Sequence, residues 1–240
     1  FPEDAETYQI QFSIMKDVVS MCIDTSGAGL HKRGYRPAHN AAPLKETMAA
    51  AMVTLSRYRG REDFCDPFCG SGTIPIEAAL IAKNRAPGIS RRFSAMDWTT
   101  LDQSVWSLAV EEARSREFSG DYRIVGSDID PAALRIAREN AVRAGVDDVV
   151  RFEKADASEF ARKTENGIIV TNPPYGERIM EKQEAETLYR SFGKAWSATE
   201  NWKLYLLSSH TEFERCFGTP STKKRKLYNG MIKCDLFMYF

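Results

Sequence analysis

Polar and aromatic side chains in the stretch TNPPYGERI, residues 171–179, directly follow the apolar run GIIV. The run predicts a buried strand, and two successive prolines end sheet pairing because proline lacks a backbone N–H and has a fixed φ. The segment therefore presents Asn172 and Tyr175 on a stiff backbone. The other residues of a site that would include them have to be sought at the ends of the other strands.

A second stretch, DPFCGSGTIP at residues 66–75, places glycines after another short apolar run. Gly70 and Gly72 allow a tight turn and a close approach of the backbone to a ligand, and Thr73 is expected to cap the helix that follows. A glycine pair alone also occurs in turns without chemistry. Asp66 adds information, because a phosphate loop normally offers Lys and Ser or Thr, whereas an acid suits a cationic ammonium or sulfonium. The pattern disfavours an NTPase.

Acidic residues follow two further strand candidates. In GSDIDPAALRIARENAVRAG, Asp130 is expected to cap a helix that begins at Pro131. Asp128 is given no capping role and lies where dinucleotide folds bind ribose hydroxyls. In KADASEF, the Asp156 carboxylate is placed to accept from an adenine amino group. Capping of a short helix at Ala157 is the alternative role for Asp156.

Short strand candidates alternate with helices over most of the chain, which favours an α/β fold with a mostly parallel, doubly wound sheet. The expected elements are a helix at 44–58, DFCD, a helix from Thr73, YRIVGSDI, a helix from Pro131, VVRFEKAD, GIIVTN, a helix near 183–199 and WKLYLLSS. In such sheets ligands bind at the carboxyl ends of the strands, where the residues above fall. An Asn229-Gly230 turn between apolar runs predicts a C-terminal antiparallel hairpin.

The amino-terminal segment predicts a small β appendage. QIQFSIMKDVVSMCID, at 9–24, alternates apolar and polar residues on both sides of Lys16-Asp17, as a hairpin does. The chain begins at Phe1 instead of Met, so we expect a fragment whose upstream part is missing. We therefore divide it into residues 1–36, a hairpin with a basic linker, and residues 37–240, the main α/β domain.

The composition is that of a globular chain. Its 240 residues are 43% hydrophobic and 28% charged, and 33 Lys and Arg balance 33 Asp and Glu. A nucleic-acid partner would therefore be engaged through local basic patches. The five cysteines form no CxxC pair, which disfavours a zinc site and fits a reduced, cytoplasmic chain of small core cysteines. No apolar run of about 18 residues and no signal peptide is visible, so neither a membrane-spanning nor a secreted protein is expected.

In this order, DPFCGSG, GSDID, AD and NPPY resemble the motifs of class I S-adenosylmethionine (SAM)-dependent methyltransferases that act on exocyclic amines, which have a Rossmann-like fold. The strings LHKRGYR, AAPLKETMAAAMV, IPIEAALIAKNRAPG, NPPYGERI and KLYNG narrow the resemblance. They are similar to the catalytic domain of bacterial 23S ribosomal RNA guanine-N2 methyltransferases and their tRNA-modifying relatives. That family carries an RNA-binding THUMP domain on the amino-terminal side. The resemblance implies SAM as cofactor, RNA as partner, no metal, and an upstream THUMP-like domain of which residues 1–36 are the tail.

The resemblance also assigns roles to residues of this chain. The cofactor-binding residues are Ala42, Pro43, Asp66, Pro67, Phe68, Gly70, Gly72, Thr73, Asp128, Ile129, Asp156, Ala157 and Asn172. The catalytic residues are Asn172, Pro173, Pro174 and Tyr175.

The chemistry of a purine amine explains the catalytic set. Its lone pair is delocalised into the ring, so the nitrogen is a poor nucleophile. The Asn172 side-chain oxygen and the Pro173 carbonyl would accept its two hydrogens and favour a pyramidal nitrogen that faces the SAM methyl. Stacking of a base on Tyr175 is worth about 1 to 3 kcal/mol. TNPPY lacks the thiolate that cytosine-C5 transfer requires.

RNA contact is expected at two basic runs, for which solvated loops are the alternative. They comprise Lys32, Arg33 and Arg36, and Lys223, Lys224, Arg225 and Lys226. The long link from Asn84 to Phe118 contains aromatic residues that would shape a base entrance or, by default, pack beneath a loop. The three histidines form no triad or metal set.

Other substrates and a non-enzyme remain open. The same motif serves methylation of adenine N6 in DNA or RNA, of tRNA guanine, or of a glutamine amide in a release factor. A SAM- or RNA-binding module without turnover is the non-catalytic alternative. The sequence leaves undecided the modified nucleotide, ribosomal against transfer RNA, the oligomeric state, and activity without the upstream domain.

Overall fold

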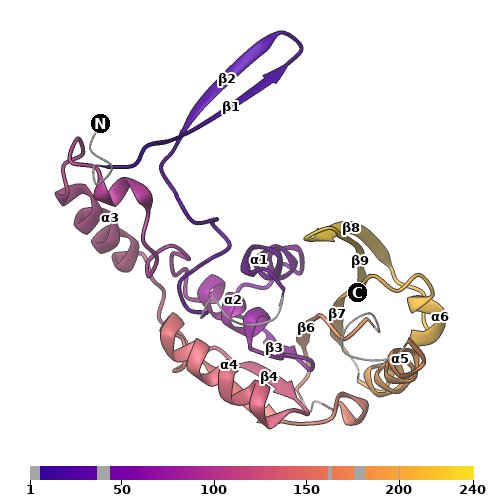
Figure 1. The fold of residues 1–240 in the computed structure, drawn as a ribbon. Helices are drawn as coiled ribbons and strands as arrows, with labels where there is room; N and C mark the ends of the chain where they lie inside the picture. The colour runs from indigo at the N-terminus through magenta and orange to yellow at the C-terminus, as the bar shows by residue number, and fades with distance from the viewer. Residues whose placement is uncertain (1–5, 37–43, 162–163, 176–181, 200) are drawn as a thin grey trace.

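The computed structural model describes residues 6–36, 44–161, 164–175, 182–199 and 201–240. It contains a two-stranded hairpin and a seven-stranded sheet with helices on both faces (Figure 1). The elements in chain order are β1 (Gln9–Met15), β2 (Val18–Asp24), α1 (Glu46–Leu55), β3 (Asp63–Asp66), α2 (Thr73–Ala82), η1 (Ser94–Asp97), α3 (Ser104–Ser115), β4 (Ile124–Asp128), α4 (Pro131–Ala144), β5 (Val150–Lys154), η2 (Ala157–Glu159), β6 (Gly167–Thr171), α5 (Lys182–Ser197), β7 (Trp202–Ser208), α6 (Phe213–Phe217), β8 (Lys223–Asn229) and β9 (Ile232–Tyr239).

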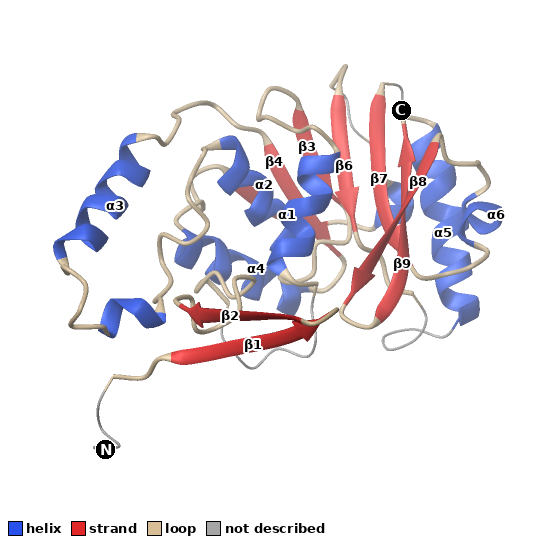
Figure 2. Ribbon diagram, turned by 90° about the horizontal axis from the view of Figure 1, so that it is seen from above, coloured by secondary structure: helices blue, strands red, loops and turns tan. Residues whose placement is uncertain are grey.

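The large sheet has the strand order β5-β4-β3-β6-β7-β9-β8. Figure 2 shows β4, β3, β6 and β7 side by side within it. Strands β3 to β7 pair in parallel, and β9 is antiparallel to both β7 and β8. The mostly parallel α/β sheet and its C-terminal antiparallel pair are therefore confirmed. The chain runs from β3 outward to β5 and then returns to the other side of β3 as β6. This reversal creates the switch point where open α/β sheets bind ligands.

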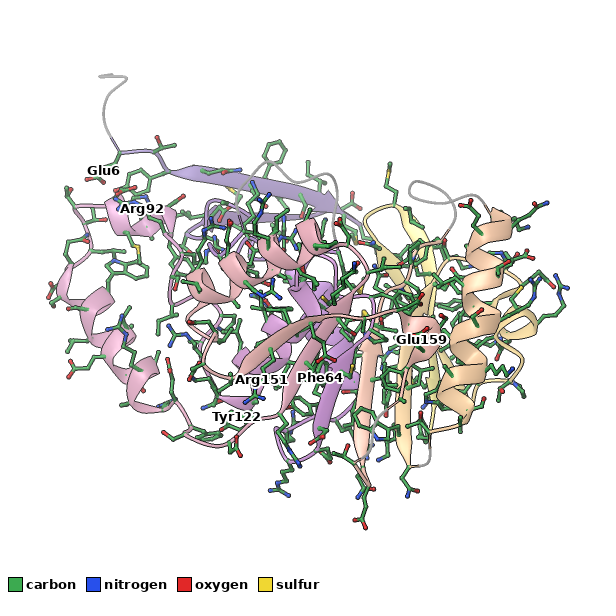
Figure 3. The ribbon with its side chains drawn as sticks, turned by 90° about the horizontal axis from the view of Figure 1, so that it is seen from below. Glu6, Phe64, Arg92, Tyr122, Arg151 and Glu159 are labelled. Carbon is green, nitrogen blue, oxygen red and sulfur yellow. The ribbon has the colours of Figure 1, made fainter. Side chains whose placement is uncertain are left out.

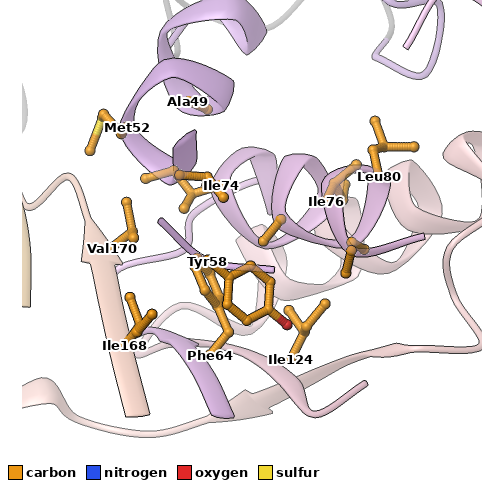
Figure 4. Close-up of a cluster of buried hydrophobic side chains, with 14 of the residues drawn as sticks. Ala49, Met52, Tyr58, Phe64, Ile74, Ile76, Leu80, Ile124, Ile168 and Val170 are labelled. Carbon is orange, nitrogen blue, oxygen red and sulfur yellow. The ribbon is translucent and has the colours of Figure 1, made fainter. Parts of the chain in front are cut away.

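Helices on the two faces explain why β6 is apolar without alternation. Ile168 and Val170 pack with α1 and α2 in one core cluster (Figure 4), and Ile169 packs with α5 and α6 in the other. All five residues of β6 are buried, as the sequence predicted. Parallel strands covered on both faces have this continuous apolar character. Each of these side chains contributes about 1.5 to 3 kcal/mol of apolar burial relative to exposure.

Helix α4 begins and ends where the sequence predicted. The Asp130 carboxylate accepts from the Ala132 backbone N–H at 2.8 Å, and Gly145 ends the helix with a left-handed φ of 66°. The expected cap at the start of α2 is wrong. Gly72, with a φ of 82°, is the N-cap there, and Thr73 is already the first helical residue.

The amino-terminal hairpin is also confirmed. Lys16 and Asp17 have φ values of 50° and 62°, which suit a two-residue hairpin turn. In Figure 1 the hairpin projects away from the rest of the chain. One of its faces carries only apolar side chains, each more than half exposed: Ile10, Phe12, Ile14, Val19, Met21 and Ile23. The domain boundary after residue 36 stays a prediction, and Tyr35, only 2% exposed, already belongs to the core of the sheet domain.

The link between α2 and β4 packs on the base of this hairpin. Trp98 stacks on Tyr8 with ring centroids 4.7 Å apart, and its indole N–H donates to the Thr7 carbonyl at 3.1 Å. Figure 3 places Glu6 and Arg92 at this end of the molecule, away from Glu159 of η2. Trp98 of the link thus packs as the default interpretation expected, and Phe93 stacks on Trp106 with ring centroids 5.8 Å apart.

Candidate active site

Four strand ends of the sheet meet at one edge, because β5, β4, β3 and β6 are parallel neighbours. Asp66 and Asp128 are the last residues of their strands, and Asn172 directly follows β6. Asp156 comes two residues after the end of β5. The strand order therefore brings together residues that are about 100 positions apart in the sequence.

The turn after β3 depends on its two glycines, which have φ values of 50° at Gly70 and 82° at Gly72. A Cβ on Gly72 would lie 2.9 Å from the Phe152 ring and 3.0 Å from Ala137, so this glycine is required for packing. A Cβ on Gly70 would meet nothing within 4 Å. No atom of the described residues therefore covers the side of Gly70 on which a side chain would lie, so a ligand can approach the backbone there.

Asp128 has a structural role that the sequence did not reveal. One carboxylate oxygen accepts from the Gly70 N–H at 2.8 Å and the other from the Asp130 N–H at 3.0 Å. A carboxylate offers about four lone-pair positions, so acceptor capacity remains for two ribose hydroxyls. The next residue, Ile129, is 64% exposed and provides an apolar surface beside it. These acceptors and this apolar surface suit an adenosine, and the ribose contact expected of Asp128 stays a prediction.

Asp66 is buried and joins two parts of the site. Its Oδ1 accepts from the Thr171 hydroxyl at 2.6 Å and from the Phe68 N–H at 3.1 Å, and only 1% of the residue is exposed. Loss of hydration raises the pKa of this carboxyl to about 7, against the smaller opposing effect of the two hydrogen bonds. The carboxylate is directed at protein partners, so its expected pairing with a cationic ligand group stays a prediction.

Asp156 caps a short helix, which is the alternative role expected for it. Its Oδ1 accepts from the Ser158 N–H at 2.8 Å and caps η2, which begins at Ala157. The adenine contact expected of Asp156 stays a prediction. Ala42 and Pro43, expected beside the cofactor, lie outside the described residues.

The end of β6 presents Asn172 and Tyr175 to each other. The Tyr175 hydroxyl donates to the Asn172 side-chain oxygen, which fixes the rotamer of the amide. A carbonyl oxygen has two lone pairs, so Asn172 keeps one for an amine hydrogen. The arrangement can therefore combine an oriented acceptor with an aromatic ring, within one rigid turn.

The first basic run is largely occupied by protein carboxylates. Arg33 lies 3.6 Å from Glu77, and Arg36 lies 3.6 Å from Glu46, with 13% and 12% of their side chains exposed. Burial raises the pKa of Glu77 to about 7, while Arg33 lowers it. Sequence reasoning missed Glu77, although a lone acid within the apolar helix TIPIEAALIA requires a partner. Phosphate contact by these arginines stays a prediction.

The second basic run forms strand β8 and not a loop. β8 is the edge strand of the sheet, and charged side chains on an edge discourage pairing with other chains. Lys224 pairs with Glu214 at 2.6 Å. The exposed Lys223, Arg225 and Lys226 remain candidates for phosphate contact.

The remaining expectations concern cysteines, metals and membranes. Cys65, Cys69, Cys216 and Cys234 are buried as predicted, but Cys22 is exposed on the hairpin. Within the described ranges, no three His, Cys, Asp or Glu side chains gather as metal ligands would. None of the helices that the structure describes is long and apolar enough to span a bilayer.

Comparison with known proteins identifies the family. The family model described as "RMKL-like, methyltransferase domain" matches residues 33–237. The chain belongs to this family. The putative RNA methyltransferase YpsC of Bacillus subtilis is 44% identical over 239 residues, which are 99% of this chain and 62% of that protein. The ribosomal RNA large subunit methyltransferase K/L of Shewanella baltica (strain OS195) is 38% identical over 98% of this chain and 34% of its own length.

Two solved structures, described as a methyltransferase and a methylase, are similar to nearly the whole of this RMKL-like domain. SMU.472, a putative methyltransferase complexed with SAH, superposes with a TM-score of 0.92 at 39% identity and covers 100% of this chain and 63% of that chain. A predicted N6-adenine-specific DNA methylase from Listeria monocytogenes superposes with a TM-score of 0.93 at 44% identity, over 99% and 62% of the two chains. The chain thus spans less than two thirds of these relatives.

The buried Asp66 carboxyl gives a pH-dependent stability. Its pKa is about 7 in the folded protein against 3.8 for the free group, so the folded state holds the proton more tightly. The free energy of unfolding should therefore fall as pH rises from about 4 to about 7. Asp66→Asn keeps an acceptor oxygen without a charge. As pH rises over this range, we expect the free energy of unfolding of the variant to increase relative to that of the wild type, by at most about 4 kcal/mol.

The measurement is urea unfolding of both proteins at pH 5 and pH 8. Glu77 titrates in both proteins, so its contribution cancels in the difference. A difference between the two proteins that is the same at both pH values would refute the shifted titration of Asp66.

Proposed function

We propose that this domain transfers the methyl group of SAM to the exocyclic N2 amine of a guanine in RNA, with 23S ribosomal RNA as the substrate. The observation that carries the proposal is the oriented Asn172 amide beside the Tyr175 ring, at the strand end next to the glycine turn. The family assignment supports methyl transfer as the reaction.

The cofactor side of the proposal rests on the glycine turn. The open backbone at Gly70, the spare acceptors of Asp128 and the exposed Ile129 suit an adenosine. SMU.472, which is similar over the whole of this chain, was solved with SAH, the product that SAM leaves behind. Bound SAM would supply a methyl group on a positively charged sulfur, ready for nucleophilic attack.

The residues after β6 would prepare the amine. Asn172 Oδ1 and the Pro173 carbonyl accept its two hydrogens, which directs the nitrogen lone pair away from both. The nitrogen would become positively charged as the new N–C bond forms and the S–C bond breaks, with its electron pair left on sulfur, so the same two dipoles would stabilise the transition state more than the ground state. The charged amine then loses a proton to water. No strong base is required at any step.

The choice of RNA rests on the relatives and on charge. Two relatives that match nearly the whole of this chain are named as a putative RNA methyltransferase and a ribosomal RNA methyltransferase. Lys32 and the exposed cations of β8 would contact phosphates. We further propose that a THUMP-like RNA-binding domain lies upstream in the longer protein and that the protein acts in the cytoplasm.

Methylation of adenine N6 is the second candidate. The Listeria monocytogenes structure is described as a predicted N6-adenine-specific DNA methylase. Adenine N6 and guanine N2 are both amines conjugated with a purine ring, so the same acceptors would serve either of them. The two candidates differ in substrate and share the mechanism.

Nucleoside mass spectrometry distinguishes the two. Unmodified ribosomal RNA, transfer RNA and DNA are each incubated with labelled SAM and this chain, and in parallel with the longer protein. Labelled N2-methylguanosine from ribosomal RNA would support the proposal. Labelled N6-methyladenine would overturn the substrate, and the absence of label with the longer protein would overturn the activity.

Loss of the amide acceptor should affect transfer more than cofactor binding. We expect Asn172→Ala to lower the rate of methyl transfer at least tenfold, because the amine loses one of two oriented acceptors. The SAM dissociation constant should stay near the wild-type value. Rates are measured in single turnovers and affinity by titration calorimetry. Transfer above a tenth of the wild-type rate, with normal SAM affinity, would refute the role of Asn172.

Loss of the β4 acid should affect cofactor binding. Asp128→Ala removes the proposed ribose acceptors and the support of the Gly70 N–H, so we expect the SAM dissociation constant to rise at least tenfold. Asp148→Ala is the matched control, because Asp148 is an exposed acid that pairs with Lys83. Equal SAM affinity in the two variants would contradict the ribose assignment.

A further inference from the structure

A buried tyrosine holds the proline segment from the side of helix α5. Tyr189 is fully buried, and its hydroxyl donates a hydrogen bond of 2.6 Å to the Pro174 carbonyl. Pro174 is the second proline of the catalytic stretch. The bond therefore joins α5, which packs on the opposite face of the sheet from α1 and α2, to the backbone that carries the proposed amine acceptors.

The position of this hydroxyl is itself fixed by its surroundings. The Tyr189 ring makes edge contacts with His210 at 5.7 Å and with Phe213 at 5.0 Å between centroids. The hydroxyl also lies 3.4 Å from the Ser208 hydroxyl, at the end of β7. The ring is fully buried among these groups, so the hydroxyl has little freedom to leave the Pro174 carbonyl.

His210 has a hydrogen bond at one ring nitrogen and a longer contact at the other. Nδ1 accepts from the Glu212 N–H at 3.2 Å. Nε2 lies 3.5 Å from Glu186, which is one helical turn before Tyr189 on α5. These contacts connect the end of β7 to the same helix that provides the tyrosine.

The proline segment has few remaining degrees of freedom. Both proline rings fix φ, so the soft torsions are the ψ angles of Pro173 and Pro174 and the φ and ψ of Asn172, which the following proline restricts to extended values. On the upstream side, Thr171 is held by sheet pairing with Leu206 and by its hydrogen bond to Asp66. On the downstream side, the Tyr189 hydroxyl holds the Pro174 carbonyl. The Pro173 carbonyl lies between these two restraints, which together set its direction.

We propose that Tyr189 is a positioning residue for methyl transfer. It acts through the Pro174 carbonyl and keeps the Pro173 carbonyl and the Asn172 side chain aimed at the two hydrogens of the target amine. The inference rests on the proposed function. Tyr189 acts behind the acceptors, so its loss should lower the rate of the chemical step and leave the affinity for SAM unchanged.

Tyr189→Phe removes one oxygen atom and keeps the buried ring. Misorientation of catalytic groups by an ångström or less has large effects on rate, and we expect the single-turnover rate of methyl transfer to fall about tenfold. The RNA concentration for half-maximal rate and the SAM dissociation constant should each stay within about twofold of the wild type.

Tyr239→Phe is the matched control. Tyr239 is also buried, and its hydroxyl also donates to a backbone carbonyl, that of Thr219, at 3.1 Å. It lies on β9, which does not pair with β6. The two variants should have similar thermal unfolding temperatures, and only Tyr189→Phe should be slow. Equal transfer rates in the two variants would overturn the proposal.

A second variant covers the case in which Tyr189→Phe does not fold. Ser208→Ala removes the hydroxyl that neighbours Tyr189 and should lower the transfer rate about two- to threefold. An unchanged rate in a folded Ser208→Ala protein would then reject the positioning role. The proposed function is tested separately, with the wild type. It fails if the wild type does not label guanine in RNA, and the rates of the variants do not bear on that result.

Discussion

A buried hydrogen bond between Thr171 and Asp66 holds the two halves of the site together. Strands β3 and β6 pair up to Cys65 and Ile169, and the side-chain bond continues that contact just where the two strands separate. The glycine turn leaves on one side of this bond and the proline segment on the other. A cofactor and an acceptor base bound on these two segments would thus be positioned by one contact. Its cost is a carboxyl removed from water, which is tolerated because two donors satisfy it.

The basic segment before α1 illustrates a similar use of charge inside the fold. Tyr35 and Arg33 both reach Glu77 on α2, and Arg36 connects Thr73 with Glu46 on α1. These contacts fix the start of α2, which is also the end of the glycine turn. Removal of one partner would leave a buried charge uncompensated, which costs more than the net strength of the pair. The segment thus supports the cofactor loop whether or not it also contacts RNA.

The predictable part of the structure is local. Gly70 and Gly72, the Asp130 cap and the Asn229-Gly230 turn each follow from the preference of a residue for a backbone conformation, and the alternation of elements gave the sheet. Residues that depend on distant partners escaped sequence reasoning. Asp128 accepts a hydrogen bond from a glycine 58 positions away, and Arg36 donates one to Thr73, 37 positions away.

Sequence patterns also fail where two interpretations share one composition. The basic run at 223–226 is compatible with a solvated loop and with an edge strand. Only the pairing of β8 with β9 distinguishes the two. Tyr189 lies in an amphipathic helix, where a tyrosine reads as a core residue. Its hydroxyl bond to Pro174 became visible only when α5 was placed beside β6 and β7.

The pKa of about 7 at Asp66 has a consequence for ligand binding. Its raised pKa leaves the carboxyl partly protonated near neutral pH, and SAM has positive charges on its sulfonium and its ammonium groups. A cation that binds nearby favours the ionised carboxylate, and by linkage the loss of the proton strengthens the binding of the cation. If the predicted pairing of Asp66 with a cationic group of SAM holds, uptake of the cofactor and release of a proton to the solvent would be a single coupled equilibrium. The heat of binding would accordingly depend on the ionisation enthalpy of the buffer.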